Sequence, residues 1–371
     1  IVGVSTFSAT SFFVPPKGST AERPSDCEPG SIRFNTDTAN LEYFRGKTLG
    51  WSQFELVNPN LGGGTGSNTG LGVRGIIGGA QTPGNAPTTS MRFITISTFG
   101  ADQDFGDLSV SKQFSTGLAS RTRGISVGGR SSNSPYPSLN TIEFVTFAST
   151  GDATDFGDSS SQQRGAGASS QTRGVFTLGN ISPYNIIEYI TLAQTGNSVD
   201  FGDLSNSRRN VDGSGFSSST RGIFAGAYTP NTAYGRDVIN FITISTLGDS
   251  TDFGTLSSIT FAQMGASSNS TRGIFAGAYA NAQANVIQFI TIATTGDTTD
   301  FGDLTDTRRR AMSVSSPTRA VILGGGSPGN VGDRTTMNKI EFATTGDGVD
   351  FGTLSVNYEH GGAFSNGHGG L

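Results

Sequence analysis

The feature that most constrains this chain is one sequence pattern that occurs six times. Its cleanest copy spans residues 271–304 and reads TRGIFAGAY, a short variable stretch, and then NVIQFITIATTGDTTDFGDL. A period near 50 residues is typical of propeller or solenoid arrays. The pattern therefore constrains the shape of the protein more than its chemistry. The Asp of a recurring Asp-Phe-Gly step marks the copies, with gaps of 51, 45, 52, 48 and 50 residues, at Asp104, Asp155, Asp200, Asp252, Asp300 and Asp350.

The composition fits many short strands joined by tight turns. Gly accounts for 54 of 371 residues, about twice the usual share, and charged residues are 14%. The net charge is −5 and no run of Lys or Arg occurs, so we expect neither nucleic acid nor an anionic membrane as a partner. No stretch approaches the length of a membrane-spanning helix. Cys27 is the only cysteine, so no intrachain disulfide can form.

Each repeat contains four strand-like pieces. In their clearest copies they lie at residues 164–170, 272–277 and 286–294, with a fourth around Asp-Phe-Gly. The third piece is apolar on both faces, because side chains alternate along a strand and both alternating sets are hydrophobic here. A sheet that is buried on both faces must lie between two others, as the blades of a propeller do.

The ends of the repeat region predict how the array closes. The region begins with a second piece at residues 72–80 and ends with a first piece at residues 358–366. These two pieces are expected to pair, which completes the first sheet and removes free strand edges. The fold class predicted is therefore all-β, a six-bladed β-propeller closed by its last strand.

The recurring Arg and double Gly resemble the kelch repeat. The Arg occurs at Arg74, Arg123, Arg173, Arg221, Arg272 and Arg319, and the double Gly is kept at residues 78–79, 128–129 and 324–325. Gly226 and Gly277 are followed by Ala and Gly179 by Asn, and Phe stands where kelch repeats typically have Trp. The resemblance implies a propeller that serves as a binding platform or, with added residues, as an enzyme.

Residues 1–57 lie outside the repeat. Alternating residues between Ser31 and Phe44 predict a β-hairpin, and residues 51–54 a third short strand. Residues 58–70, NPNLGGGTGSNTG, read as a Gly-rich linker, so we expect an N-terminal adaptor over 1–57 and the propeller over 71–371.

This N-terminal stretch resembles a segment of tailed-bacteriophage virion proteins, especially fibre and tail components. The similar residues are VPPKGSTAERP at 14–24, GSIRFNTDTANLEYFRG at 30–46, and Trp51. The resemblance implies localisation in the virion, with other virion proteins as partners of the adaptor.

The spacing inside the repeat separates two rims of the predicted propeller. The distance from the start of the third piece to the Asp of Asp-Phe-Gly is 13 in every copy, whereas the distance from the Arg to the third piece varies from 14 to 19. Variation therefore falls in residues 80–90, 130–141, 180–186, 227–238, 278–286 and 327–336, on one rim. Exposed aromatic and Arg side chains dominate recognition surfaces, although loop tyrosines also shield strand ends. The candidate binding residues on this rim are Arg130, Tyr136, Tyr184, Tyr228, Tyr234, Arg236 and Tyr279.

The Asp-Phe-Gly step favours a structural role. A kinase reading fails because the step occurs six times and no His-Arg-Asp or Val-Ala-Ile-Lys motif accompanies it. We expect the Asp to form an ion pair with the recurring Arg, and the Gly to allow a close approach. The Phe is expected to fill the space between blades, at Phe105, Phe156, Phe201, Phe253, Phe301 and Phe351.

No residue set predicts catalysis, a metal or a cofactor. Asp297, Asp300 and Asp303 have a spacing that could supply some calcium ligands, but Asn197 and Thr255 replace members of this set in other copies. His360 and His368 are the only histidines, too few for a zinc site or for a copper oxidase of the kelch type.

The sequence thus favours a non-enzymatic phage virion protein, a fibre, tail-surface or decoration component. Its adaptor would anchor it, and its propeller would display a binding face to a host-surface glycan or receptor, as a monomer or a homo-oligomer. Two alternatives stay open: a secreted bacterial kelch-like adhesin, which would need a secretion signal, and a polysaccharide-acting enzyme, which would need converging carboxylates.

Overall fold

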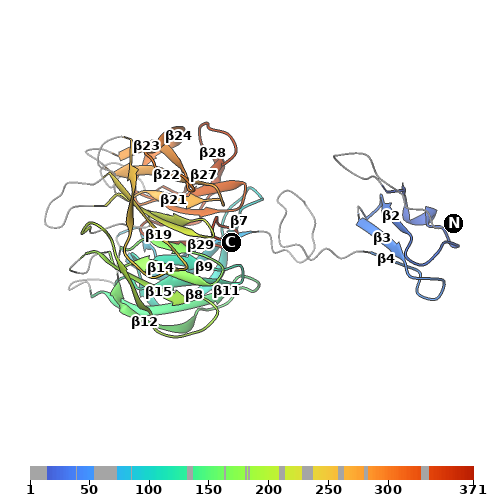
Figure 1. Ribbon diagram of the computed structural model, residues 1–371, viewed down its shortest axis with the longest axis horizontal. Coiled ribbons are helices and arrows are strands. Elements are labelled where there is room, and N and C mark those ends of the chain that lie inside the picture. The colour runs from blue at the N-terminus through green and yellow to red at the C-terminus, as the bar shows by residue number, and fades with distance from the viewer. Residues whose placement is uncertain are drawn as a thin grey trace. The chain divides into compact units, whose positions relative to one another are not determined.

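The chain divides into two compact units, Ile1–Pro59 and Asn60–Leu371 (Figure 1). The computed structural model describes residues 15–38, 40–53, 73–84, 86–131, 137–162, 164–179, 182, 184–208, 214–227, 237–257, 263–279, 283–326 and 334–371. These residues contain strands and one short 3-10 helix, η1 (Thr20–Glu22), which confirms the predicted all-β class. Among them, no helix has the length and apolar character needed to cross a bilayer.

The described residues of the first unit form one four-stranded sheet. Strands β2 (Ile32–Asn35) and β3 (Asn40–Phe44) form an antiparallel hairpin, and β4 (Trp51–Gln53) pairs with β3. Strand β1 (Lys17–Gly18) pairs with β2 in parallel. The alternating residues of β2 and β3 make the hairpin visible in the sequence, whereas the two residues of β1 are too few to show a period.

A buried carboxylate ties this small sheet together. Glu42 is fully buried and accepts hydrogen bonds from Arg23 at 2.7 Å and Asn35 at 3.2 Å, and Arg33 lies 3.5 Å away. Burial by itself raises the pKa of Glu42, but the hydrogen bonds from Arg23 and Asn35 and the charges of both arginines outweigh it, so the pKa is lowered. Glu42 therefore stays ionised beside its partners.

The described part of the second unit contains six antiparallel sheets (Figure 1). Five consist of four consecutive strands, and the sixth joins the last strand to the first strands of the unit. The strands are β9 (Thr116–Ala119), β10 (Arg123–Val127), β11 (Leu139–Thr146) and β12 (Thr154–Gln162); β13 (Gly167–Ser169), β14 (Arg173–Thr177), β15 (Ile186–Thr191) and β16 (Val199–Asp203); β17 (Gly215–Ser217), β18 (Arg221–Ala225), β19 (Val238–Thr243) and β20 (Thr251–Thr255); β21 (Gly265–Ser268), β22 (Arg272–Tyr279), β23 (Gln283–Thr291) and β24 (Thr299–Arg308); β25 (Met312–Ser315), β26 (Arg319–Leu323), β27 (Thr336–Glu341) and β28 (Val349–Thr353); and β29 (Gly362–Ser365), β5 (Arg74–Gly78), β6 (Gln81–Thr82), β7 (Ala86–Thr95) and β8 (Gln103–Lys112).

The sixth sheet is built from both ends of the unit. Strand β29 pairs antiparallel with β5, so that Gly362–Ser365 lies opposite Gly75–Gly78. The innermost strands also contact one another in chain order, β9 with β13, β13 with β17, β17 with β21, β21 with β25 and β25 with β29, and β29 contacts β9. These contacts are consistent with a propeller-like fold.

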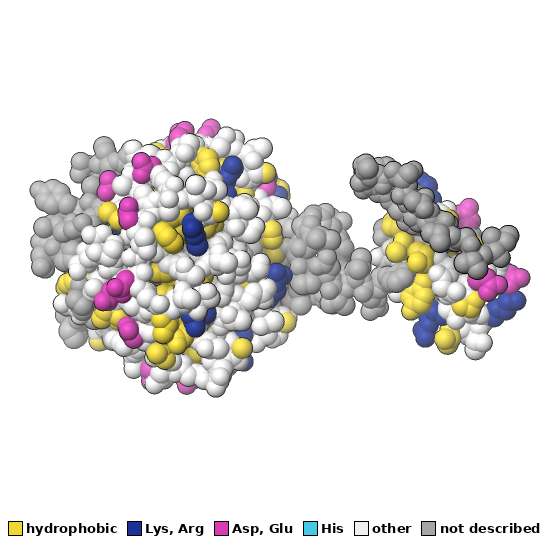
Figure 2. Space-filling view, viewed as in Figure 1, with side chains coloured by type: hydrophobic (Ala, Val, Ile, Leu, Met, Phe, Trp, Pro, Cys, Tyr) yellow, Lys and Arg dark blue, Asp and Glu magenta, His cyan; other side chains and the backbone are white. Residues whose placement is uncertain are grey.

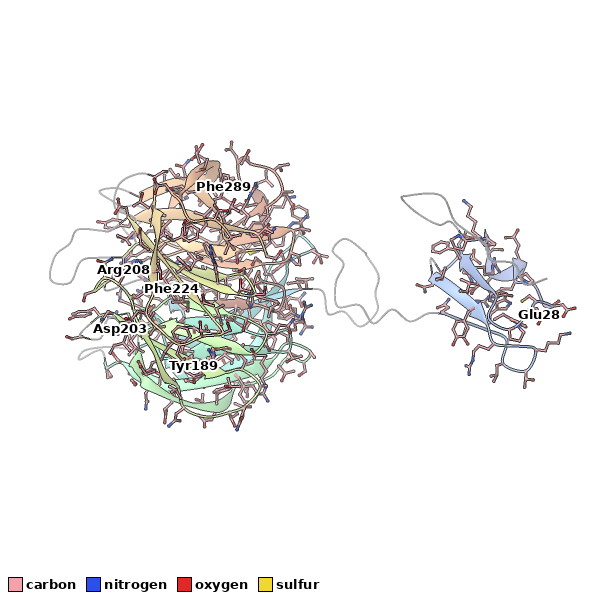
Figure 3. The ribbon with its side chains drawn as sticks, viewed as in Figure 1. Glu28, Tyr189, Asp203, Arg208, Phe224 and Phe289 are labelled. Atoms are coloured by element: carbon pink, nitrogen blue, oxygen red, sulfur yellow. The ribbon has the colours of Figure 1, made fainter. Side chains whose placement is uncertain are left out.

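Each Phe of an Asp-Phe-Gly step is buried in an apolar cluster that includes residues of the next sheet. Phe253 of β20 packs with Phe275 and Ile290 of the sheet that follows. Phe351 of the last complete sheet packs with Ile94 and Ile96, which belong to the first part of the unit. Other aromatic side chains of these clusters are labelled in Figure 3: Tyr189, Phe224 and Phe289. The other four members of the set are Phe105, Phe156, Phe201 and Phe301, each at most 3% exposed.

The Gly of the same step lets the next sheet approach closely. Gly254 has a φ of +151°, and a Cβ atom at this position would clash with the carbonyl group of Gly296 in the next turn. The N–H of Gly296 donates in turn to the carbonyl oxygen of Phe253, at 2.8 Å. The other five copies repeat this approach, between residues 106 and 151, 157 and 196, 202 and 248, 302 and 346, and 352 and 100.

The recurring Arg joins neighbouring sheets. The prediction that it forms an ion pair with the Asp of the Asp-Phe-Gly step is wrong. The Asp of every Asp-Phe-Gly step is exposed, and within the described residues none of these Asp side chains pairs with a recurring Arg. Each Arg instead donates to a backbone carbonyl at the end of the third strand of the next sheet, as Arg221 does to Ile292 at 2.9 Å. Five of the six also stack on an aromatic ring of their own third strand, as Arg221 does on Phe241 at 4.7 Å.

Antiparallel pairing separates two rims of the second unit. Arg123 at the start of β10 pairs with Thr146 at the end of β11, so the turn before β10 and the turn after β11 lie on the same rim. On the opposite rim the second and fourth strands end and the third and first strands begin. We call it the variable rim, because the segments that join the second strand to the third differ in length from copy to copy.

Candidate functional site

Five non-glycine residues with a left-handed backbone form a set at the variable rim. Each lies three residues before an equivalent position of an innermost strand, and the corresponding residue before β17 lies in 209–213, outside the described residues. The left-handed region is unusual for bulky side chains and costs about 1–3 kcal/mol per residue. We call this set the mouth ring: Phe114 (φ 61°), Arg164 (φ 60°), Gln263 (φ 62°), Arg310 (φ 59°) and His360 (φ 52°).

Backbone hydrogen bonds connect the members of the mouth ring. The N–H of Arg164 donates to the carbonyl oxygen of Phe114 at 3.0 Å, and the N–H of Phe114 donates to that of His360 at 2.7 Å. His360 donates to Arg310 at 3.2 Å, and Arg310 donates to Gln263 at 2.7 Å. Three of these bonds join residues 47 to 50 positions apart, and the bond between Phe114 and His360 joins the two ends of the second unit, so the strained conformation is maintained by the neighbouring sheets.

The side chain of Phe114 lies among cationic and aromatic groups. The guanidinium of Arg164 stacks over its ring with the Cζ atom 3.7 Å from the centroid, and that of Arg130 at 4.3 Å. The imidazole ring of His360 lies 4.2 Å from it, centroid to centroid. Stacking of guanidinium groups on an aromatic face is favourable and fixes their orientation. Phe114 therefore acts as a platform for two arginines.

His360 is buried within a group of arginines. Its side chain is only 6% exposed. Burial lowers the pKa of His360 well below its usual value, and the charges of Arg310, Arg164, Arg309 and Arg130 lower it further. His360 is therefore neutral at neutral pH, and the arginines supply the positive charge of this region. Arg310 forms an ion pair with Glu359 at 3.2 Å.

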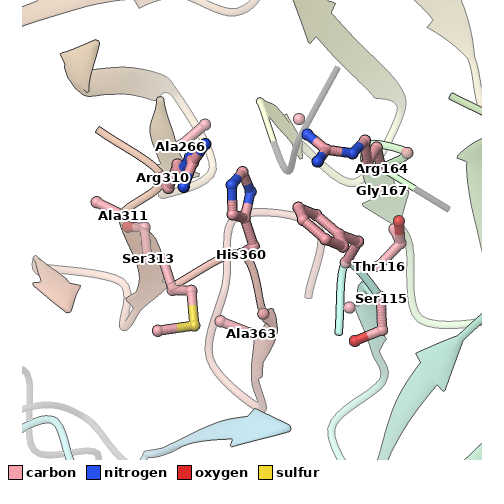
Figure 4. Close-up of a pocket in the computed structure, with 16 residues that line it drawn as sticks. Ser115, Thr116, Arg164, Gly167, Ala266, Arg310, Ala311, Ser313, His360 and Ala363 are labelled. Carbon is pink, nitrogen blue, oxygen red and sulfur yellow. The ribbon is translucent and has the colours of Figure 1, made fainter. Parts of the chain in front are cut away.

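Four members of the mouth ring line a pocket between the innermost strands. The pocket has a volume of about 50 Å³, and its walls continue along Thr116–Gly117, Gly167, Gly215, Ala266 and Met312–Ser313. Figure 4 shows His360 between Arg310 on one side and Arg164 on the other. Both arginines are partly exposed, so solvent reaches this pocket.

Residues 367–371 lie at the opposite end of the space between the innermost strands, where Gly369 and Gly370 lie against Ser217 and Ser169. Serines at the ends of the strands bond from one strand to the next, as Ser217 Oγ does to the carbonyl of Ser169 at 2.6 Å. His368 Nε2 lies 3.0 Å from the carbonyl oxygen of Ala119, and the N–H of Gly370 donates to His368 Nδ1 at 3.1 Å. Because Nδ1 accepts, Nε2 carries the proton and donates to Ala119.

The structure brings two of the residues expected from the sequence to this region. Arg130 stacks on Phe114. The charge of Arg309 lowers the pKa of His360, and its guanidinium stacks on Tyr279 with the Cζ atom 4.9 Å from the ring centroid. Tyr184 is half-buried in a different loop, where its carbonyl oxygen accepts from the N–H of Arg208 at 2.8 Å; the side chain of Arg208 is buried within the unit (Figure 3). The other four candidates, Tyr136, Tyr228, Tyr234 and Arg236, lie outside the described residues.

Sequence reasoning missed the mouth ring. Its members are Phe, Arg, Gln, Arg and His, so they share no residue type and leave no motif. The available signal was their constant place, three residues before the equivalent positions Gly117, Gly167, Ala266, Ser313 and Ala363 of the innermost strands.

One of the aspartates with metal-like spacing, Asp297, has a structural role. Asp297 accepts hydrogen bonds from the N–H and the hydroxyl of Thr255 at 2.8 and 2.9 Å, which lowers its pKa. Asp152, Asp249 and Asp347 accept from the backbone of the preceding sheet in the same way. Within the part of the chain that is described, no three His, Cys, Asp or Glu side chains gather as metal ligands would.

Comparison with models of known protein families and with curated proteins finds no match. The chemistry of the site is therefore read from its residues. Guanidinium groups fixed on an aromatic platform around a small pocket are suited to binding an anionic or planar group.

Proposed function

We propose that the second unit is a six-bladed, kelch-like β-propeller that serves as a non-enzymatic binding module. Its support is the series of contacts between innermost strands, which runs from β9 to β29 and returns to β9. The bond from Arg319 to the carbonyl of Ile96, the same contact that joins the other neighbouring sheets, adds to this support. A ring of sheets held by such repeated contacts is a rigid scaffold for loops.

The observation that carries a binding role is the coincidence of two features at one rim. The strands that flank the segments of variable length end and begin at the rim that carries the mouth ring, whereas β5 begins at the opposite rim. Strained residues held by their surroundings occur preferentially at functional sites. We infer that the variable rim is where the module contacts its ligand or receptor.

We further propose that the protein is a structural component of a phage virion, a fibre, tail-surface or decoration protein. The support is the similarity of residues 14–24 and 30–46 to tailed-phage virion segments. In this proposal the first unit binds other virion proteins, and the propeller displays its variable rim to a host-surface glycan or receptor.

The test is to locate the full chain in purified particles of the phage that encodes it. We expect its peptides in intact virions, with cross-links from the described lysines of the first unit, Lys17 and Lys47, to another virion protein. A chain found free in the culture medium and absent from particles would contradict the virion proposal.

A second experiment tests the non-enzymatic role. The purified full chain is incubated with host capsular polysaccharide, and the release of new reducing ends is followed over time. We expect binding without release. Release that is abolished by substitution of a pair of carboxylates would make the protein an enzyme.

A further inference from the structure

We propose that the pocket lined by Phe114, Arg164, Arg310 and His360 binds one anionic group, a carboxylate or a phosphate, of a saccharide ligand. The proposal rests on the proposed function as a binding module, for which it states the chemistry of the recognised group. It concerns a site at the centre of the variable rim, between the innermost strands, rather than the loop residues expected from the sequence.

Positive charge is concentrated around this pocket. Arg164 and Arg310 line the pocket, and Arg130 and Arg309 lie close enough to act on His360. The chain as a whole carries a net charge of −5, so this concentration of arginines stands out from the rest of the sequence. On the face of the second unit visible in Figure 2, acidic side chains are scattered among uncharged ones. These arginines favour an anion near the pocket, and Glu359 pairs with one of them, Arg310.

The two arginines that line the pocket offer planar hydrogen-bond donors. A guanidinium presents planar N–H donors that match a carboxylate or a phosphate in a fork, and it accepts no hydrogen bond. Arg164 and Arg310 reach the pocket from opposite sides of His360 (Figure 4). A neutral hydroxyl would gain little from two such groups, whereas an oxyanion between them gains charge-assisted bonds.

Arg164 and Arg310 are held in place before any ligand binds. The left-handed backbones of Arg164 and Arg310 are fixed by hydrogen bonds to Phe114 and Gln263, and the Arg164 guanidinium is held on the Phe114 ring at 3.7 Å. Arg310 is held by Gln263 at 3.4 Å and by Glu359 at 3.2 Å. Side chains that are fixed before binding lose little conformational entropy when the ligand arrives.

The size of the pocket limits which part of a ligand can enter it. The pocket volume of about 50 Å³ admits a few waters, because one water needs roughly 10–15 Å³ of such space. A carboxylate or phosphate group fits this volume, and a whole sugar ring does not. The rest of the saccharide would therefore lie outside the pocket, at the variable rim.

The experiment is isothermal titration calorimetry of the full chain with glucuronate, glucose 6-phosphate and glucose at constant ionic strength. We expect both anions to bind with Kd values roughly in the millimolar range, and glucose to show no binding. Comparison of the two anions identifies which group the pocket prefers. Anions that bind no better than glucose would overturn the proposal.

Variants locate the binding. Arg164→Gln and Arg310→Gln should each weaken anion binding at least tenfold, whereas Arg121→Gln, an equal change of charge at an exposed position on the opposite rim, should stay within twofold of the wild type. Arg164→Lys keeps the charge but loses the fork, so its affinity should be intermediate. Unchanged binding in the pocket variants, or an equal loss in Arg121→Gln, would overturn the proposal.

Two controls separate this inference from the proposed function. The melting temperature of each variant shows whether it is folded, and Arg164→Lys supplies a second reading if Arg164→Gln is unstable. Particles whose attachment to host cells is independent of Arg164 and Arg310 would contradict the inference and leave the binding role standing. Anion binding that depends on both arginines in a chain absent from virions would support the inference and contradict the virion role.

Discussion

The guanidinium of Arg319 donates to the carbonyl oxygen of Ile96 at 3.2 Å, although the two residues are 223 positions apart in the sequence. Five other arginines make the same bond to the next sheet over much shorter separations, such as Arg123 to Leu192 at 3.2 Å. The last repeat thus contacts the first as each repeat contacts its successor. A sixfold set of equal contacts makes single-site substitutions informative, because each copy has five internal references.

Removing one of these arginines should weaken the junction between two sheets. In Arg221→Ala, the bonds to Ile292 and Ala293 and the stacking on Phe241 are lost. We expect the free energy of unfolding to fall by about 2 kcal/mol, since a hydrogen bond from a charged group contributes about 1.5–3 kcal/mol. Denaturant unfolding measures it. Arg121→Ala, an exposed position on the same rim, serves as the control, and an equal effect of both substitutions would contradict the contact's role.

The buried Phe of the Asp-Phe-Gly step should matter most for stability. Phe253 is 2% exposed, and Phe253→Ala would open a cavity between two sheets. We expect a loss of about 3–5 kcal/mol, as for other core aromatic residues. Leu247→Ala removes a side chain that is 56% exposed and should change stability little. A melting temperature that Phe253→Ala leaves unchanged would exclude the packing role.

Two glycines with similar backbone angles should differ in their tolerance of Ala. Gly254 (φ +151°) faces the carbonyl of Gly296, whereas Gly248 (φ +146°) has open space where a Cβ would stand. Both substitutions introduce backbone strain, but only Gly254→Ala also separates two sheets. We expect Gly254→Ala to be the more destabilising of the two in thermal unfolding. Equal losses would mean that backbone strain alone explains these glycines.

Acid should destabilise the protein partly through His368. Burial lowers the pKa of this residue from 6.5 to about 4. Below pH 6.5 the unfolded chain therefore takes up a proton that the folded chain does not, so the free energy of unfolding falls between about pH 6.5 and pH 4. Protonation would also place a hydrogen on Nδ1, which accepts from Gly370.

The comparison of wild type with His368→Gln isolates this contribution. From pH 7 to pH 4 the wild type should lose up to about 3 kcal/mol more than the variant, at about 1.4 kcal/mol for each unit of pKa difference. Denaturant unfolding at a series of pH values measures this. Other groups that titrate in both proteins, His360 among them, cancel in the comparison. Parallel pH profiles would contradict the lowered pKa.

Much of the architecture is readable from local patterns. The alternation in residues 31–44 predicts the hairpin of β2 and β3, and the four pieces of a repeat correspond to the four strands of a sheet in five of the six sheets, as β21 to β24 show. The sequence also predicts that residues 358–366 pair with 72–80, and β29 and β5 are paired. These features depend on periodicity and on the order of strands, which the chain carries locally.

The sequence predicts less of the candidate site than of the architecture. Arg130 and Tyr279 were expected from residue type and loop position, and both lie against groups that surround His360. Phe114, Arg164 and Arg310 were not expected, because nothing in their own segments distinguishes them. The predicted pairing of Asp with the recurring Arg was wrong because carbonyl oxygens of the next sheet lie closer to the Arg than the exposed Asp does.

By itself, the sequence determined the repeat, the strand order and the positions of the apolar side chains that need burial, because these follow from the alternation of residues along each strand. Only the tertiary structure decided which groups meet between sheets: the Arg319 to Ile96 bond, the close approach at Gly254 and the left-handed residues around His360. Contacts of this kind join residues about 40 or more positions apart. Their partners are set by how one sheet packs on the next, and no local pattern of a single strand encodes that packing.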